Sequence, residues 1–236
     1  MENTKIYIFG ASGHGKVVSE LITNNQCKIE AMVDDEPKLN YFNEIPIINS
    51  TFLPEAAENI ALIIAIGNNI TRKKISSRFN EFNFFSSVHK TAFVSPSATI
   101  GKGTVVMIYA IVNADATIGN HVIINTAALI EHDCTIDDFA HISPKVTLSG
   151  NVKIGTGTHV GSGAIVIPGI KIGKWCTIGA GAVVINDIPD GATVIGNPGK
   201  IIKYNNTFET QTYLDNSPAL QKVIESSGEY SNLNSL

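Results

Sequence analysis

The sequence is poor in charge and has no cluster of basic residues. Charged residues make up 16% of the 236 residues, and the formal net charge is -4. A surface that binds nucleic acid or anionic lipid needs concentrated positive charge. We therefore expect neither a nucleic-acid partner nor an anionic membrane surface.

Cysteine and long apolar segments are also scarce. The three cysteines, Cys27, Cys134 and Cys176, show neither the spacing of a disulfide framework nor that of a zinc site. The first ten residues, MENTKIYIFG, lack the basic segment followed by a long apolar one that marks a signal peptide or a membrane span. These absences predict a cytoplasmic protein.

The first 88 residues instead alternate between short apolar strands and helices. Such alternation predicts a small parallel sheet, so we expect a Rossmann-like α/β domain over residues 1–90. The expected strands are Lys5–Phe9, Ile29–Val33, Ala61–Ile66 and Phe84–Val88, and the expected helices are Lys16–Thr23 and Thr71–Phe79.

From about Val94 the hydrophobic pattern repeats every six residues. Valine, isoleucine or leucine occupies sixteen consecutive positions at this spacing: Val94, Ile100, Val106, Val112, Ile118, Ile124, Ile130, Ile136, Ile142, Leu148, Ile154, Val160, Val166, Ile172, Ile178 and Val184. So short and regular a repeat is typical of a solenoid, in which each coil buries its inward side chains against the next.

Small residues stand two positions before many of these aliphatic residues, as at Ala128, Cys134 and Ala140. One aliphatic residue on each flat face, followed by a turn, predicts a triangular prism of about five coils over residues 91–203. We expect Ile185–Lys203 to leave the prism.

The last segment, residues 204–236, is a polar tail. Ser217 as N-cap and Pro218 at the first helical position predict one short helix over Ala219–Glu225.

A glycine-rich turn connects the first expected strand to the first expected helix. In Gly10-Ala11-Ser12-Gly13-His14-Gly15 the bare backbone lets a phosphate approach amides at a helix N-terminus. Asp34 and Asp35 end the second strand, where a ribose or base can be hydrogen-bonded. The turn lacks the G-x-G-x-x-G spacing of dinucleotide enzymes, and a tight turn that binds nothing is the alternative.

The segment Asn125–Asp133 carries the best candidate for catalysis. Glu131 follows an inward position, so His132 falls next to a corner and faces outward. A histidine beside carboxylates is a suitable general base, because its ordinary pKa is near neutral and a carboxylate orients the ring. Cys134 falls in a small inward position, which argues against a role as a nucleophile.

Several motifs together resemble one known family. They are GASGHGKVV from Gly10, IAIGN from Ile64, RKKI from Arg72, HKTA from His89 and SPSA from Ser95. Over residues 3–203 the chain resembles the sugar O-acyltransferases (sialic acid O-acetyltransferase-like) and, among hexapeptide acyltransferases, most closely the bacterial UDP-4-amino-sugar N-acetyltransferases of bacillosamine biosynthesis. The resemblance implies a left-handed β-helix, a homotrimer, acetyl-CoA as donor and a UDP-linked amino sugar as acceptor.

The resemblance also assigns roles to individual residues. It implies that His132 is the general base, followed in the family by Glu and here by Asp133, so that either Asp133 or Glu131 orients the ring. Asn125 and His141 are expected beside the amino sugar. The positions expected to bind the nucleotide-sugar in the small domain are Gly13, His14, Gly15, Asp34 and Asp35.

Glycines in later coils resemble the CoA-binding coils of the family. Gly150 matches the position whose amide contacts the acetyl carbonyl, and Gly161, Gly179 and Lys200 are expected on the CoA side. The alternative for these glycines is architectural, because tight corners of a β-helix need small residues.

Three other functions compete with N-acetylation of a sugar amine. The acceptor can instead be a hydroxyl, as in sialic acid O-acetylation, or the chain can be a non-catalytic nucleotide-binding scaffold trimer. A zinc site like that of β-helix carbonic anhydrases needs closely spaced histidines, and His121, His132, His141 and His159 lack that spacing. We therefore expect no metal.

Overall fold

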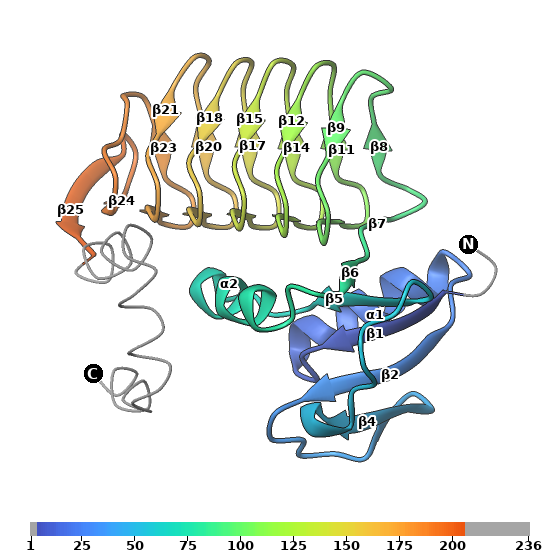
Figure 1. Cartoon of the computed structure of the whole chain (residues 1–236). Helices are drawn as coiled ribbons and strands as arrows, with labels where there is room; N and C mark the ends of the chain where they lie inside the picture. The colour runs from blue at the N-terminus through green and yellow to red at the C-terminus, as the bar shows by residue number, and fades with distance from the viewer. Residues whose placement is uncertain (1–3, 206–236) are drawn as a thin grey trace.

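The computed structural model describes residues 4–205. A small domain of helices and strands lies along one side of a long β-helix, and α2 runs beside several of its coils (Figure 1). The chain passes from the small domain into the β-helix through the short strands β6 and β7, so the two parts are joined by few residues.

The N-terminal domain is a six-stranded sheet in the order β3-β4-β2-β1-β5-β6, parallel except for the β3–β4 pair. Its elements are β1 (Lys5–Phe9), α1 (Gly13–Asn24), β2 (Ile29–Asp34), β3 (Tyr41–Phe42), β4 (Ile45–Asn49), η1 (Ser50–Phe52), β5 (Ile60–Ile64), α2 (Asn69–Arg78) and β6 (Asn83–Phe84). The predicted Rossmann-like α/β fold is confirmed, although β3 and β4 were not predicted. The expected strand Phe84–Val88 was wrong, because β6 belongs to this sheet and Ser87–Val88 already belongs to the β-helix.

The β-helix has three parallel sheets, which we call faces 1, 2 and 3 in the order in which the chain visits them. Face 1 contains β7 (Ser87–Val88), β10 (Val105–Val106), β13 (Ile123–Ile124), β16 (His141–Ile142), β19 (His159–Val160), β22 (Thr177–Ile178) and β24 (Ala192–Ile195). Face 2 contains β8 (Phe93–Val94), β11 (Ile111–Val112), β14 (Leu129–Ile130), β17 (Thr147–Leu148), β20 (Ile165–Val166) and β23 (Val183–Val184). Face 3 contains β9 (Thr99–Ile100), β12 (Thr117–Ile118), β15 (Thr135–Ile136), β18 (Lys153–Ile154) and β21 (Lys171–Ile172).

The six-residue repeat forms the core of this prism, as predicted. Ile124, Ile130 and Ile142 are 0% exposed, and so are the small residues Ala128 and Cys134 that precede the inward aliphatic positions. From β10 to β22, each strand pairs with the strand eighteen residues earlier on the same face, so the inward side chains of successive coils stack on one another.

A second six-residue series marks the corners and was not predicted. These residues have positive φ, as the left-handed β-helix requires for its sharp turns. They are Gly103, Tyr109, Asp115, His121, Ala127, Asp133, Phe139, Lys145, Asn151, Gly157, Gly163, Gly169, Trp175 and Gly181. Since most are not glycine, composition alone does not reveal the series.

The end of the prism differs from expectation. Within Ile185–Lys203, β24 still continues face 1, because Thr193 pairs with Thr177. Only β25 (Lys200–Tyr204) turns back, antiparallel to β24. The predicted helix Ala219–Glu225 lies outside the described residues.

The outer surfaces of the three faces differ. The N-terminal domain packs on face 1, where Val105 and Ile123 join a buried cluster with residues of α1. Face 3 presents threonines and lysines at the outward position of each strand. Face 2 presents apolar side chains to solvent, including Phe93 (54% exposed), Ile111 (38%) and Ile165 (43%).

Candidate active site

His132 lies at the corner between face 2 and face 3, directly after β14. Its side chain is 62% exposed, and its Nδ1 lies 2.7 Å from Oδ2 of Asp133. A carboxylate only accepts, so Nδ1 carries the proton and donates it, which leaves Nε2 with a free lone pair. Nε2 makes no hydrogen bond within residues 4–205. The hydrogen bond that His132 donates to Asp133 raises the pKa of His132 above its ordinary value.

The structure distinguishes the two carboxylates beside this histidine. Asp133 adopts φ +60, one of the corner positions, which brings its carboxylate onto the ring of His132. Glu131 is engaged elsewhere, because its Oε2 accepts a hydrogen bond from Nδ2 of Asn113 at 3.0 Å. The residue that orients His132 in the structure is therefore Asp133.

Gly150 lies one coil beyond His132 and directly against its ring. A Cβ at Gly150 would lie 2.7 Å from Cε1 and 2.8 Å from Nε2 of His132, so any side chain there would displace the imidazole. Among the described residues, the N–H of Gly150 makes no hydrogen bond. Cys134 is buried nearby, and burial raises the pKa of its thiol, so it is unsuited to act as a nucleophile.

A second group of histidines lies between face 1 and the N-terminal domain. The rings of His141 and His159 stack at 4.8 Å, and His14 from α1 lies 6.3 Å from His141. Gly67, in the loop between β5 and α2, places its carbonyl oxygen 3.3 Å from Nδ1 of His141. These rings therefore connect the glycine turn to the β-helix.

Hydrogen bonds fix the protonation state of His141. Asn125 Oδ1 accepts from the N–H of Thr126 at 2.8 Å, so its amide nitrogen faces Nε2 of His141 at 3.1 Å. Nε2 must then accept while Nδ1 donates to the carbonyl of Gly67, and the ring is neutral. Burial, together with the charge of Arg72, lowers the pKa of His141 to about 3 and that of His14 to about 4.

The glycine turn opens α1 as predicted. A Cβ at Gly15 would lie 2.0 Å from the carbonyl oxygen of Gly10, so Gly15 allows the helix to approach the strand end. A Cβ at Gly13 or Gly67 would meet no described atom within 4 Å, so the backbone is open at both loops. The Nε2 atom of His14, the residue after Gly13, is buried without a partner among the described residues.

The acidic pair at the end of β2 already has partners. Asp34 accepts hydrogen bonds from the N–H groups of Ala11 at 3.1 Å and Glu36 at 3.0 Å, which ties the glycine turn to β2. Asp35 forms an ion pair with Arg78 at 2.9 Å. Asp34 thus supports the turn, and Asp35 is anchored to α2.

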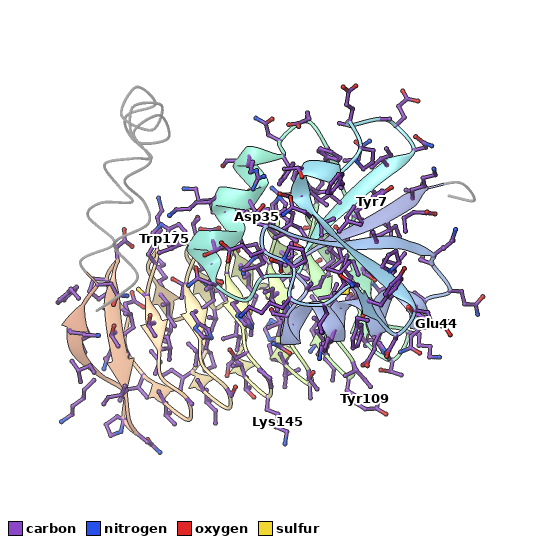
Figure 2. All side chains as sticks on the ribbon, turned by 90° about the horizontal axis from the view of Figure 1, so that it is seen from below. Tyr7, Asp35, Glu44, Tyr109, Lys145 and Trp175 are labelled. Carbon is purple, nitrogen blue, oxygen red and sulfur yellow. The ribbon has the colours of Figure 1, made fainter. Side chains whose placement is uncertain are left out.

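The residues expected on the CoA side lie on two different edges. Gly150 is on the edge between faces 2 and 3, whereas Gly161 and Gly179 are on the edge between faces 1 and 2. A Cβ at Gly161 would lie 2.6 Å from the carbonyl oxygen of Ile178, so packing alone requires this glycine. Lys200 begins β25 with an exposed side chain. Figure 2 shows Tyr109 and Lys145, both corner residues of the edge between faces 1 and 2, pointing away from the molecule.

The single constellation predicted from the sequence is therefore divided. His132 and Asp133 lie on one edge of face 2, while Asn125 and His141 lie at face 1 with the glycine turn. One chain does not bring these two groups together. Arg72, part of the RKKI motif, was given no role of its own, yet its charge helps to lower the pKa of His141 and of His14 in the second group.

A cavity of about 270 Å³ lies next to the second group. The loop at Asn68 and the start of α2 form one wall, and His159 and Trp175 form the other. Figure 2 shows Trp175 beside α2. Across residues 4–205 the structure contains no group of three potential metal ligands, and none of its helices is long and apolar enough to span a bilayer.

Comparisons with known proteins match both parts of the chain. Residues 5–79 match the PglD N-terminal domain family, and residues 151–186 match the bacterial transferase hexapeptide family. The UDP-N-acetylbacillosamine N-acetyltransferase of Bacillus subtilis (strain 168) is 44% identical over 109 residues, which are 43% of this chain and 50% of that protein. The match thus spans half the length of that relative.

Solved structures extend the likeness over most of the chain. The acetyltransferase domain of PglB from Neisseria gonorrhoeae FA1090 is 41% identical, with a TM-score of 0.80, covering 85% of this chain and 100% of that one. PerB from Caulobacter crescentus, solved with CoA and GDP-perosamine, is 37% identical with a TM-score of 0.80, covering 84% and 97%. These proteins do not support the sugar O-acyltransferase label suggested by the motifs. The chain belongs to the family of hexapeptide-repeat acetyltransferases with a PglD-type N-terminal domain.

Proposed function

We propose that this protein transfers the acetyl group of acetyl-CoA to the amino group of a nucleotide-linked 4-amino-4,6-dideoxy sugar. The observation that carries the proposal is the His132–Asp133 pair lying against Gly150. The relatives support the choice of acceptor, because UDP-N-acetylbacillosamine and GDP-perosamine appear in their names.

The chemistry follows from the free lone pair of His132. Nε2 accepts a proton from the sugar amine as the amine attacks the thioester carbonyl, and Asp133 stabilises the imidazolium that results. The N–H of Gly150 donates to the oxyanion of the tetrahedral intermediate. This intermediate collapses to the amide and the CoA thiolate, which takes the proton from His132. No acyl-enzyme forms.

We assign the nucleotide-sugar to the N-terminal domain. The open backbone at Gly13 and Gly67 accommodates a pyrophosphate at the start of α1, and His14 offers an unpartnered Nε2 beside it. Asn125 and His141, which are hydrogen-bonded to each other at 3.1 Å, are the residues that we expect beside the sugar. Among nucleotides we favour UDP, as in the name of the Bacillus subtilis relative.

We infer a homotrimer, because the two groups of site residues lie apart within one chain. The exposed apolar side chains of face 2, such as Phe93 and Ile165, need a partner. If three prisms pack face 2 toward a threefold axis, each edge carrying His132 meets a neighbour's edge carrying Asn125 and Gly161. Each active site then takes its base from one subunit and its nucleotide-sugar from the next, with CoA between them.

A panel assay tests the proposal. Purified protein is mixed with acetyl-CoA and UDP-, GDP- or dTDP-linked 4-amino sugars, and free thiol is followed. We expect thiol release with an amino sugar, none with the matched 4-hydroxy sugar, and loss of turnover in His132→Asn. Light scattering should give the mass of a trimer. Release only with a hydroxyl acceptor such as sialic acid, or no release and no nucleotide binding, would refute the proposal.

A further inference from the structure

Arg72, in the first turn of α2, is completely buried at 0% exposure. Its guanidinium donates six hydrogen bonds of 2.7 to 3.3 Å, and within residues 4–205 none of the acceptors is a carboxylate. A buried cation without an anionic partner is costly, and breaking its bonds leaves a charge uncompensated. Such a residue needs an explanation that packing alone does not give.

Three of the bonds reach one edge of the β-helix. Nε donates to the carbonyl of His121 at 2.8 Å, and one terminal nitrogen donates to the carbonyls of Phe139 at 2.7 Å and Ala140 at 3.3 Å. Asn69 accepts from the same nitrogen and donates to the carbonyl of Gly157 at 2.9 Å.

The acceptors on this edge repeat with the coils. His121, Phe139 and Gly157 are eighteen residues apart, and all three are corner residues with positive φ. Their carbonyls are therefore presented one coil apart on the same edge. Arg72 and Asn69 together span three successive coils, so α2 is fixed along the axis of the β-helix as well as against it.

The remaining bonds reach the loop between β5 and α2. The other terminal nitrogen of Arg72 donates to the carbonyls of Ile66 at 2.8 Å and Gly67 at 3.2 Å. The carbonyl of Gly67 is the one that also faces Nδ1 of His141. One side chain thus ties a loop at the open backbone of the N-terminal domain directly to the β-helix.

We propose that Arg72 is a positioning residue that sets where the nucleotide-sugar lies along the axis of the β-helix. This inference rests on the proposed function. The loop at Gly67 contributes to the proposed nucleotide-sugar site, whereas the base of that site comes from the β-helix of a neighbouring subunit. Because the β-helices pack against one another in the proposed trimer, the distance between amine and base depends on how each N-terminal domain is held on its own β-helix. Lysine cannot replace Arg72, because a single ammonium group lacks the planar fork that reaches both the loop and the edge.

Acceptor and donor kinetics test this role. We would compare Arg72→Lys and Arg72→Met with Lys28→Gln, which removes a cation from a side chain that is 82% exposed. In both Arg72 variants the KM for the amino sugar should rise at least tenfold and kcat should fall, while the KM for acetyl-CoA stays within twofold. Lys28→Gln should match the wild type in all three constants. A folded Arg72→Lys with wild-type constants, or with both KM values raised equally, would overturn the proposal.

Asn69→Ala decides the matter if both Arg72 variants fail to fold, since it removes only the anchor to Gly157 and one acceptor of Arg72. It should raise the acceptor KM selectively but by less, and an unchanged acceptor KM would contradict the positioning role. Failure of the proposed function is recognised separately, because the wild type itself would then release no thiol. Calorimetric titration with UDP or GDP gives a second readout that does not depend on turnover.

Discussion

His132 and His141 lie nine residues apart in one β-helix, yet their surroundings give them opposite properties. His132 is exposed on an edge, and a carboxylate raises its pKa. His141 is partly buried under the N-terminal domain, and burial with neighbouring positive charge lowers its pKa to about 3. Only His132 can exchange a proton near neutral pH. The six-residue repeat therefore determines where a histidine lies, whereas the residues around it determine its pKa.

Replacing His132 should produce the largest change in activity. We expect His132→Asn to lower kcat/KM by about 10²- to 10⁴-fold, the usual contribution of a general base. The midpoint of thermal unfolding should not change, because the ring is exposed. His141→Gln should instead lower the midpoint of thermal unfolding, and it should reduce kcat by less than His132→Asn does. If the two variants lost activity equally, the contrast between the histidines would fail.

Lowering the pH should destabilise the folded protein through its buried histidines and not through His132. The pKa values of His14 and His121 are lowered to about 4 and that of His141 to about 3, by burial first. Between pH 6.5 and these values the unfolded chain binds more protons than the folded chain, so stability falls as pH falls. The loss is on the order of 1.4 kcal/mol per histidine and pH unit.

Urea unfolding at pH 7.5, 6.0 and 5.0 measures this loss. The free energy of unfolding of His141→Gln should fall less steeply with decreasing pH than that of the wild type. The free energy of unfolding of His132→Asn should fall as steeply as that of the wild type. A stability that stays constant down to pH 5.0 would contradict the neutral, buried state assigned to these rings.

Gly150 offers a way to disturb His132 without replacing it. The methyl group of Gly150→Ala would lie within 3 Å of the ring, which must move, so we expect kcat to fall by roughly 10- to 100-fold. Gly173→Ala is the control, because its Cβ would clash with Asp190 on another edge, in a coil that neither Arg72 nor Asn69 contacts. Both variants should unfold at lower temperature, and only Gly150→Ala should lose kcat. Equal losses of kcat would mean that general strain, not the displaced ring, is responsible.

The smallest effect is expected from the carboxylates. Asp133→Asn removes the hydrogen bond that raises the pKa of His132, so the acidic limb of the pH–rate profile should move to lower pH. We expect kcat to fall roughly fivefold, as an exposed pair contributes little. Glu131→Gln should hardly shift the acidic limb of the pH–rate profile, because Glu131 is hydrogen-bonded to Asn113 and not to His132. A larger shift in Glu131→Gln would reverse the assignment.

Much of the fold was predictable because its determinants are local and repeated. The aliphatic ladder from Val94 to Val184 fixed the inward face of every coil, and the glycine turn fixed the start of α1. The corner series was not predictable, since residues as different as Trp175 and Lys145 adopt positive φ there. The continuation into β24 was also missed, because its register to β22 breaks the eighteen-residue step.

The candidate site was predicted residue by residue but not as an arrangement. Proximity in sequence suggested that Asn125, His132 and His141 act together, whereas a six-residue repeat sends successive segments to different faces. Arg72 belongs to the RKKI motif, but the motif does not reveal its contacts, because most of its acceptors are backbone carbonyls that any residue can supply.

The sequence by itself determined the prism, its inward residues and the presence of an outward histidine beside two carboxylates. These features depend only on the hydrophobic period and on residues that are adjacent in the sequence. The tertiary structure decided which carboxylate contacts His132 and that His141 is neutral. It also decided that the two halves of the site lie apart. These properties depend on burial and on contacts between residues distant in sequence, such as Gly67 with His141 and Arg72 with Phe139.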